Sequence, residues 1–336
     1  MMYTRYGSPQ ELQLVDVAVP EPRAHELRVA VRAVSLNGSD AEFLSGSPAY
    51  ARMAGLFRPR RAFRILGSDV AGVVDAVGAE VHDLAPGDEV YGDLFEHFGG
   101  LAEQVCAPRK RWVRKPAGLS FEQAAALPQA GVLAWQGICR EGGISGGARV
   151  LIVGAGGGVG AYGVQLAKHA GAEVTAVDGP PKLAFLRTLG ADRVVDYTNE
   201  SYAAPGEGYD LVLDIAGRRS VRELRRALAP TGRYLIVGGL LRNVLGAVVL
   251  GLVARLVRSK QSLGILPWDR DPRLVEAVAE RVLEGTLRPP IDVVVPLERA
   301  GEAFSRLLRG EAQGKVVVTV GEGGSSRSAA RAHPPG

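Results

Sequence analysis

The chain has 336 residues, of which 46% are hydrophobic and 23% charged, and its formal net charge is +4 at pH 7. This length suits two domains and supplies enough apolar side chains for two cores, which excludes a single small fold and a disordered chain. Two cysteines exclude a disulfide framework and a cysteine-rich zinc site. The mild charge gives no reason to expect nucleic acid as a partner.

The N-terminal residues and the apolar segments allow a prediction of the cellular location and of membrane binding. The most apolar stretch covers residues 243–254, and a helix that spans a bilayer needs about 20 residues. No basic and apolar leader opens the sequence, so we expect a cytoplasmic protein without a membrane partner. Basic residues gather only at 52–64, with Phe57 and Phe63 between them, and a solvated loop is expected there.

Residues 1–121 are predicted to form a β-rich domain. Apolar residues alternate with period two at 27–34 and 70–77, which is typical of half-buried strands. The turn residues Pro86, Gly87 and Asp88 directly precede another strand. Short alternating strands separated by turns favour an antiparallel sheet.

Residues 122–263 change to an alternation of strands and helices. Strands are expected at 149–153, 173–177, 193–195, 209–215 and 233–237, and helices at 159–170, 182–189 and 221–228. Apolar strands that alternate with helices predict a parallel sheet covered on both faces, which defines an α/β fold.

The remaining residues are expected to return to the β-rich domain. Asp271 followed by Pro272 is a good helix start, and Gly285 stands where that helix would stop. Residues 315–320 form an apolar strand that no helix follows. We expect 264–320 to complete the first domain and 321–336 to be a disordered tail.

A run of glycines lies between the strand 149–153 and the helix 159–170, where a dinucleotide-binding fingerprint belongs. The register that fits the helix start uses Ala155, Gly157 and Gly160. Backbone without bulky side chains lets a pyrophosphate approach, and the helix N-terminus offers N–H groups. The expected cofactor loop comprises Ala155, Gly156, Gly157, Gly158, Val159 and Gly160.

Asp178 follows Gly160 by 18 residues and ends the next predicted strand. An acid at this place accepts hydrogen bonds from the adenosine ribose and repels a 2′-phosphate. Lys182 lies one helical turn later and would partly offset that repulsion. NADH is therefore expected to be slightly favoured, with NADPH also accepted; the alternative is that Asp178 only caps a helix.

Several motifs together resemble a known family. They include SLNGSD (35–40), LGSDVAGVVDAVG (66–78), KPAGLSFEQAAALP (115–128), YDLVLDIAG (209–217) and GKVVVTV (314–320). In this order the chain resembles the zinc-independent medium-chain dehydrogenase/reductases, in their quinone oxidoreductase-like branch. The resemblance implies a Rossmann doubly wound parallel sheet (122–263) inserted in a GroES-like β-rich domain (1–121, completed by 264–320). A homodimer is compatible with it.

The resemblance also bears on metal binding. Relatives that bind zinc carry cysteine or histidine ligands where this chain has Asn37 and Ser68, and a further cysteine near Gln129. Amide and hydroxyl groups are poor replacements for the ligands that zinc prefers. We therefore expect no metal site.

Further residues gain a role only through the resemblance. It implies that Asn37 and Asp40 lie beside nicotinamide and substrate, although Asp40 could equally be structural, and that Tyr50 lines the substrate pocket. It places Tyr197 near the adenine, Gly238 and Gly239 beside the nicotinamide, and Lys315 at the cofactor phosphates.

The expected activity follows from the expectation that the protein binds no metal. An isolated carbonyl needs a group that stabilises a localised alkoxide, whereas a conjugated acceptor spreads the charge. We expect an NAD(P)H-dependent reductase that transfers hydride to a quinone or an α,β-unsaturated carbonyl, with Asn37 and Tyr50 as hydrogen-bond donors and Tyr50 or water as the proton source. Two alternatives stay open: an enoyl reductase whose carrier-tethered substrate meets the basic loop 52–64, and a non-catalytic cofactor-binding protein.

Overall fold

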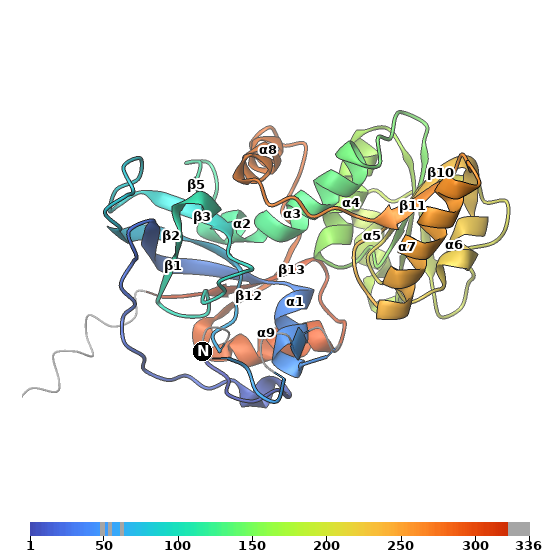
Figure 1. Ribbon diagram of the computed structural model, residues 1–336. Helices are drawn as coiled ribbons and strands as arrows, with labels where there is room; N and C mark the ends of the chain where they lie inside the picture. Colours follow the sequence, from blue (N-terminus) through green and yellow to red (C-terminus); the bar gives the residue numbers. More distant parts are fainter. Residues whose placement is uncertain (48–50, 53–55, 61–63, 322–336) are drawn as a thin grey trace, which may run out of the picture. The chain divides into compact units, whose positions relative to one another are not determined.

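The computed structural model describes residues 1–47, 51–52, 56–60 and 64–321 (Figure 1). Tyr50, Phe63 and most of the predicted tail lie outside the described residues. The chain divides into two units. One comprises Met1–Ala125, Val293–Leu308 and the segment from Val316 onward; the other comprises Ala126–Asp292 and Arg309–Lys315.

The first unit holds a seven-stranded sheet in the order β12-β13-β1-β2-β3-β5, with β4 also paired to β1. β1 pairs antiparallel with β13, β2 and β4, as the alternating sequence predicted. The strands are β1 (Glu26–Leu36), β2 (Asp69–Val77), β3 (Glu89–Asp93), β4 (Gln104–Pro108), β5 (Trp112–Arg114), β12 (Ile291–Pro296) and β13 (Lys315–Thr319). Helices of this part are η1 (Pro9–Glu11), α1 (Gly38–Ser45), η4 (Arg109–Arg111), η7 (Leu297–Arg299) and α9 (Ala300–Leu308).

The second unit holds a six-stranded parallel sheet in the order β11-β10-β9-β6-β7-β8. Its strands are β6 (Arg149–Val153), β7 (Glu173–Asp178), β8 (Arg193–Asp196), β9 (Tyr209–Asp214), β10 (Leu228–Ile236) and β11 (Ser262–Ile265). α2 (Phe121–Ala126) ends at the boundary, with all but its last residue in the first unit. The helices of the second unit are α3 (Pro128–Trp135), η5 (Gln136–Arg140), α4 (Gly158–His169), η6 (Pro180–Lys182), α5 (Leu183–Thr188), α6 (Val221–Arg226), α7 (Leu241–Leu256) and α8 (Pro272–Leu283).

Both faces of the parallel sheet are covered by helices. Leu151 and Val153 of β6 share a buried cluster with residues of α6 and α7. Ile152 points to the opposite face, where its side chain lies next to Gly163 of α4. The predicted fold class, a doubly wound parallel sheet combined with a β-rich domain, is confirmed.

The structure corrects the end of the parallel sheet. The strand at 233–237 was expected to be its last, but β11 follows and pairs with β10 in parallel. The chain stays in this unit until Asp292, whereas a return to the first unit was expected from 264. The physical reason is packing: α7 lies so close to β11 that a Cβ on Gly251 would be 2.3 Å from the Leu263 carbonyl oxygen.

Candidate functional site

The carboxyl ends of the parallel strands meet at one edge of the sheet. Val153 ends β6 opposite Val177 and Asp214, while Asp178 lies opposite Asp196. β6 lies between β7, which follows it in the chain, and β9, which follows β8, so the strand order reverses beside β6. Such a switch point is where doubly wound sheets bind ligands. The segments after these strands contain most of the cofactor residues predicted from the sequence.

The glycine loop leads from β6 into α4. Gly157 is the N-cap of α4, and a Cβ placed on it would meet only the Gly154 carbonyl oxygen, at 3.7 Å. A Cβ on Gly160 would lie 2.5 Å from the Cα of Ala155. Gly160 therefore permits close packing of helix on loop, while Gly157 leaves open space at the helix N-terminus. This division of roles fits the predicted register of Ala155, Gly157 and Gly160.

Two lysines flank the loop. A Cβ on Gly158 would be 2.8 Å from Cδ of Lys315, and one on Gly156 would be 2.5 Å from Cδ of Lys182. Both lysines are buried, with exposed fractions of 2% and 9%. The loop is joined to the Lys315 segment by a hydrogen bond of 2.9 Å from the Gly314 amide to the Gly156 carbonyl. Two cations beside a helix N-terminus favour a bound anion.

Asp178 fastens the same loop. Its Oδ2 accepts a hydrogen bond of 2.8 Å from the Gly156 amide, and its Oδ1 accepts one of 2.8 Å from Gly179. The Nζ of Lys182 lies 3.8 Å from Oδ1. Gly179, not Asp178, is the N-cap of η6. A carboxylate has about four acceptor positions, so further hydrogen bonds from hydroxyl groups can be accepted.

Tyr197 and the glycine pair 238–239 lie at the same edge of the sheet. Tyr197 is half exposed, and a Cβ on Gly179 would be 3.4 Å from its Cε1. The ring thus lies beside the segment that follows β7. Gly238 has open space where a side chain would be, whereas a Cβ on Gly239, which has φ of +111°, would lie 2.5 Å from the Gly217 Cα. The loops after β9 and β10 therefore touch each other.

A buried network that the sequence reading missed holds these two loops. Asp214 accepts hydrogen bonds from the Gly217 amide (2.8 Å) and the Tyr234 hydroxyl (2.9 Å). Asn243 donates to the Gly217 carbonyl at 2.6 Å. Burial raises the pKa of the Asp214 carboxyl, against hydrogen bonds from Gly217, Tyr234 and Ala216 that lower it. The only sequence signal was an acid at the end of an apolar strand, three residues before Gly217.

The first unit brings together Asn37, Asp40 and Ser68. Asp40 is fully buried, and its two oxygens accept hydrogen bonds of 2.8 Å from the amides of Asn37 and Gly67. Asn37 is the N-cap of α1, and its Nδ2 donates to the Ser68 hydroxyl at 3.4 Å. Asp40 therefore ties the start of α1 to the segment before β2. This geometry supports a positioning role for Asp40.

Three phenylalanines in the first unit form a cluster that the sequence did not single out. The ring of Phe98 lies 5.1 Å from that of Phe43 and 5.4 Å from that of Phe95. Phe98 has φ of +53°, a strained conformation for a bulky residue. The cluster adjoins the Ser68 segment, because the Leu94 amide donates to the Ser68 carbonyl.

The residues at the positions of zinc ligands do not fit zinc. Asn37 and Ser68 offer an amide and a hydroxyl, and Gln129 is buried in α3 of the other unit. Among the described residues, no group of three or more His, Cys, Asp or Glu side chains is arranged to hold a metal ion. A nicotinamide dinucleotide does fit the second unit: the open helix N-terminus with its two lysines suits a pyrophosphate, and Asp178 suits a ribose.

Comparisons with known proteins agree with this arrangement. Residues 23–117 match the model of the alcohol dehydrogenase GroES-like domain, and residues 189–318 match that of the zinc-binding dehydrogenases. The chain is 34% identical to the chloroplast envelope quinone oxidoreductase homolog of Arabidopsis thaliana, over 95% of this chain and 97% of that one. It is 32% identical to the chloroplastic NADPH-dependent alkenal/one oxidoreductase of the same plant, over 94% and 78%.

Among solved structures, the quinone oxidoreductase from Coxiella burnetii is similar, with a TM-score of 0.82, 30% identity and coverage of 95% and 98%. The two units thus define an oxidoreductase with a GroES-like domain and a Rossmann-like dinucleotide-binding domain. The chain belongs to the medium-chain dehydrogenase/reductase family, in its quinone oxidoreductase-like branch.

Proposed function

We propose that this protein is an NAD(P)H-dependent reductase that acts on quinones or α,β-unsaturated carbonyls. The observation that carries the proposal is the cradle at the carboxyl edge of the parallel sheet, where Gly157 opens the N-terminus of α4 between Lys182 and Lys315. The names of two relatives, a quinone oxidoreductase homolog and an alkenal/one oxidoreductase, support the class of substrate.

The chain's own residues would hold the cofactor as follows. The amides at the start of α4, together with Lys315, bind the pyrophosphate; Asp178 binds the adenosine ribose, and Tyr197 lies against the adenine. Gly238, which lacks a side chain and has open space around it, admits the nicotinamide end. When bound, the nicotinamide supplies the hydride.

The donor set favours a conjugated acceptor. Asn37 and Ser68 are poor ligands for a zinc ion, which would otherwise act as the Lewis acid that polarises an isolated carbonyl. A conjugated acceptor delocalises the charge, so hydrogen-bond donors are sufficient to hold its oxygen. We assign one such bond to the side-chain amide of Asn37, whose Nδ2 also donates to the Ser68 hydroxyl. Tyr50 or water would supply the proton. Metal analysis is expected to find far less than one zinc per chain.

The choice between the two nicotinamide cofactors depends on Asp178. Its carboxylate is held beside the glycine loop by two backbone hydrogen bonds, and an acid at this place repels a 2′-phosphate. We expect NADH to bind at least as well as NADPH in a fluorescence titration. NADPH binding that is tenfold tighter, or about 1.4 kcal/mol, would show that Asp178 does not read the ribose.

The test of the function uses matched substrates. Purified protein is offered NADH or NADPH with a quinone panel and with pairs of a simple ketone and its α,β-unsaturated analogue. Rapid turnover of quinones or enones, with loss of only the C=C bond of the enone, is expected. Equal turnover of ketone and enone refutes the choice of acceptor, and tight cofactor binding without any turnover supports the non-catalytic alternative.

A further inference from the structure

The outer face of α7 is an apolar stripe without a partner in the described structure. Of the residues in and next to this helix, nine large apolar ones are 40–82% exposed. Their spacing of three, four and seven residues places most of them on one side of the helix. The stripe consists of Leu240, Leu241, Leu245, Val248, Val249, Leu252, Val253, Leu256 and Val257.

The position of α7 is fixed by its inner face. Ala247 and Ala254 belong to the buried cluster on the sheet, and Gly251 allows the helix backbone to approach β11. The apolar stripe therefore cannot turn inward without losing this packing. A contiguous exposed apolar surface of this kind marks an interaction site, in contrast to single exposed leucines.

The charges around the stripe have one sign. From residue 224 to residue 268 the chain has no Asp or Glu, but it has seven basic residues. They are Arg225, Arg226, Arg233, Arg242, Arg255, Arg258 and Lys260. Arg242, Arg255 and Arg258 are exposed, and within the described part of the chain none of these three is paired with a carboxylate.

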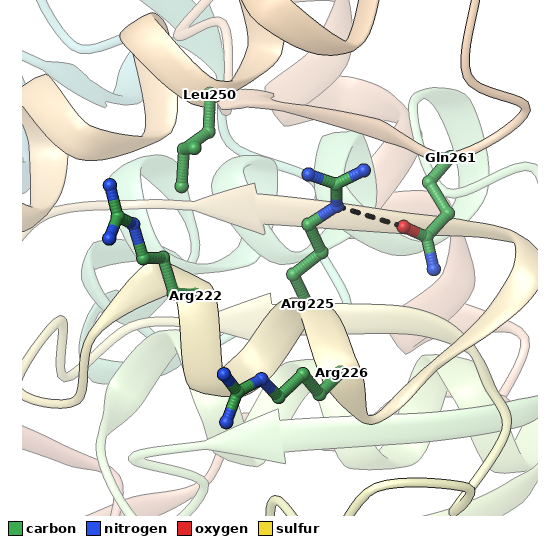
Figure 2. A pocket seen from close by; sticks show the side chains of 5 residues that line it. All are labelled: Arg222, Arg225, Arg226, Leu250 and Gln261. Carbon is green, nitrogen blue, oxygen red and sulfur yellow. Dashed lines mark hydrogen bonds between the residues drawn. The ribbon is translucent and has the colours of Figure 1, made fainter.

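A basic pocket borders α7 (Figure 2). It has a volume of about 540 Å³ and is lined by Arg222, Arg225, Arg226, Leu250 and Gln261. Arg225 is held by a hydrogen bond of 3.0 Å from its Nε to Gln261. The nearby acid, Glu223, accepts a hydrogen bond from Ser220 instead. Three guanidinium groups around one cavity suit a phosphate group.

We propose that α7 is a docking surface for an anionic phospholipid bilayer, on which its apolar stripe enters the interface and the flanking arginines contact lipid phosphates. An apolar helix face flanked by basic residues, on a helix too short to span, is typical of interfacial binding. Among the described residues no helix is long and apolar enough to cross a bilayer. The length argument that led to the expectation of no membrane partner excludes only a spanning helix.

The charge distribution favours a bilayer over a second copy of the chain. In a two-fold symmetric dimer the same patch meets itself. Two copies of α7 would therefore bring arginines close to arginines, in a segment that offers no acid to pair with them. An anionic lipid surface instead attracts each basic residue by about 1 kcal/mol.

Cosedimentation with vesicles tests the proposal. The full chain is mixed with vesicles of phosphatidylcholine alone, and with vesicles that also contain phosphatidylglycerol. We expect binding to the mixed vesicles, little binding to phosphatidylcholine, and release as the salt concentration rises. Equal binding to both vesicles, or no binding to either, overturns the proposal.

Matched variants separate the apolar and the charged contributions. Leu245→Gln with Leu252→Gln should lower the partition onto mixed vesicles at least about tenfold, whereas Leu283→Gln with Leu308→Gln, exposed leucines on α8 and α9, should not. Arg222→Gln with Arg226→Gln should lower it about tenfold or more. The control Arg187→Gln with Arg288→Gln removes the same charge at other exposed positions.

Two further measurements keep the result decisive. Circular dichroism melting should give the same midpoint for each variant and the wild type, since every substituted side chain is exposed and the partly buried Arg225 and Leu250 are retained. Sedimentation velocity without vesicles measures self-association. A dimer that the Leu245→Gln, Leu252→Gln variant abolishes, together with no vesicle binding, would assign the stripe to a second copy and refute the bilayer.

Discussion

Gly157 and Gly160 are three residues apart, but their surroundings differ. A Cβ at Gly157 would meet nothing closer than 3.7 Å, whereas one at Gly160 would meet backbone at 2.5 Å. We predict that Gly157→Val folds but binds NAD(P)H about a hundredfold or more weaker, roughly 2.7 kcal/mol. Gly160→Val should fail to fold. Melting curves and cofactor titration measure both.

Unchanged cofactor binding by the Gly157→Val variant would place the cofactor elsewhere. If a folded Gly157→Val protein binds NAD(P)H as tightly as the wild type, the pyrophosphate does not lie at the N-terminus of α4, and the register of the loop is wrong.

Asp214 gives a prediction about pH. Burial raises its pKa above the ordinary value of 3.8, so the carboxyl stabilises the fold most when protonated, and that contribution is lost as the pH rises through the raised pKa. Asp214→Asn stays neutral. The free energy of unfolding of the variant minus that of the wild type should therefore increase from pH 4 upward and then level off. Urea titrations at several pH values measure this difference, and a decrease with rising pH would contradict the direction of the shift.

The positions that local spacing determines were predictable from the sequence, with Gly157 and Gly160 at the start of α4 and Asp178 at the end of β7. Gly157, Gly160 and Asp178 follow from a glycine run between a strand and a helix and from an acid at the next strand end. Asp214 was missed because its role depends on Tyr234, which is 20 residues away. No local pattern shows that an acid at the end of a strand will accept a hydrogen bond from a neighbouring strand.

At the scale of elements, Asp40 links α1 to the segment before β2. Two amides lose their acceptor in Asp40→Ala, which should lower the free energy of unfolding by about 3 kcal/mol. Asp40→Asn keeps one acceptor oxygen and should lose less. If Asp40 only positions Asn37, the folded Asp40→Asn variant keeps a wild-type pH profile of kcat; an altered profile would show a direct catalytic role.

Elements were predictable where the apolar pattern was strong. β6 was predicted at its observed bounds, and α4 within one residue at each end. β11 (Ser262–Ile265) was missed because four residues are too few to show an alternation of apolar and polar side chains. They form a strand by pairing with β10. The apolar run of α7 was recognised only as too short to span a bilayer, because its buried and exposed faces are both apolar.

At the scale of the whole molecule, the order of motifs along the chain predicted the family and the fold class, since each unit is built around one continuous pattern. The boundaries between units were harder to predict. The segment 264–292 has no strong pattern that assigns it to either sheet, and it stays with the second unit because β11 and α8 pack there.

The central claim is that hydride is delivered to a conjugated carbon, with no metal to polarise an isolated carbonyl. The most direct measurement uses NADH or NADPH labelled with deuterium at the transferred position of C4, together with an α,β-unsaturated ketone. Mass spectrometry and NMR of the product then locate the label. We predict deuterium on the β-carbon of a saturated ketone; deuterium on the carbinol carbon of an allylic alcohol would contradict the claim.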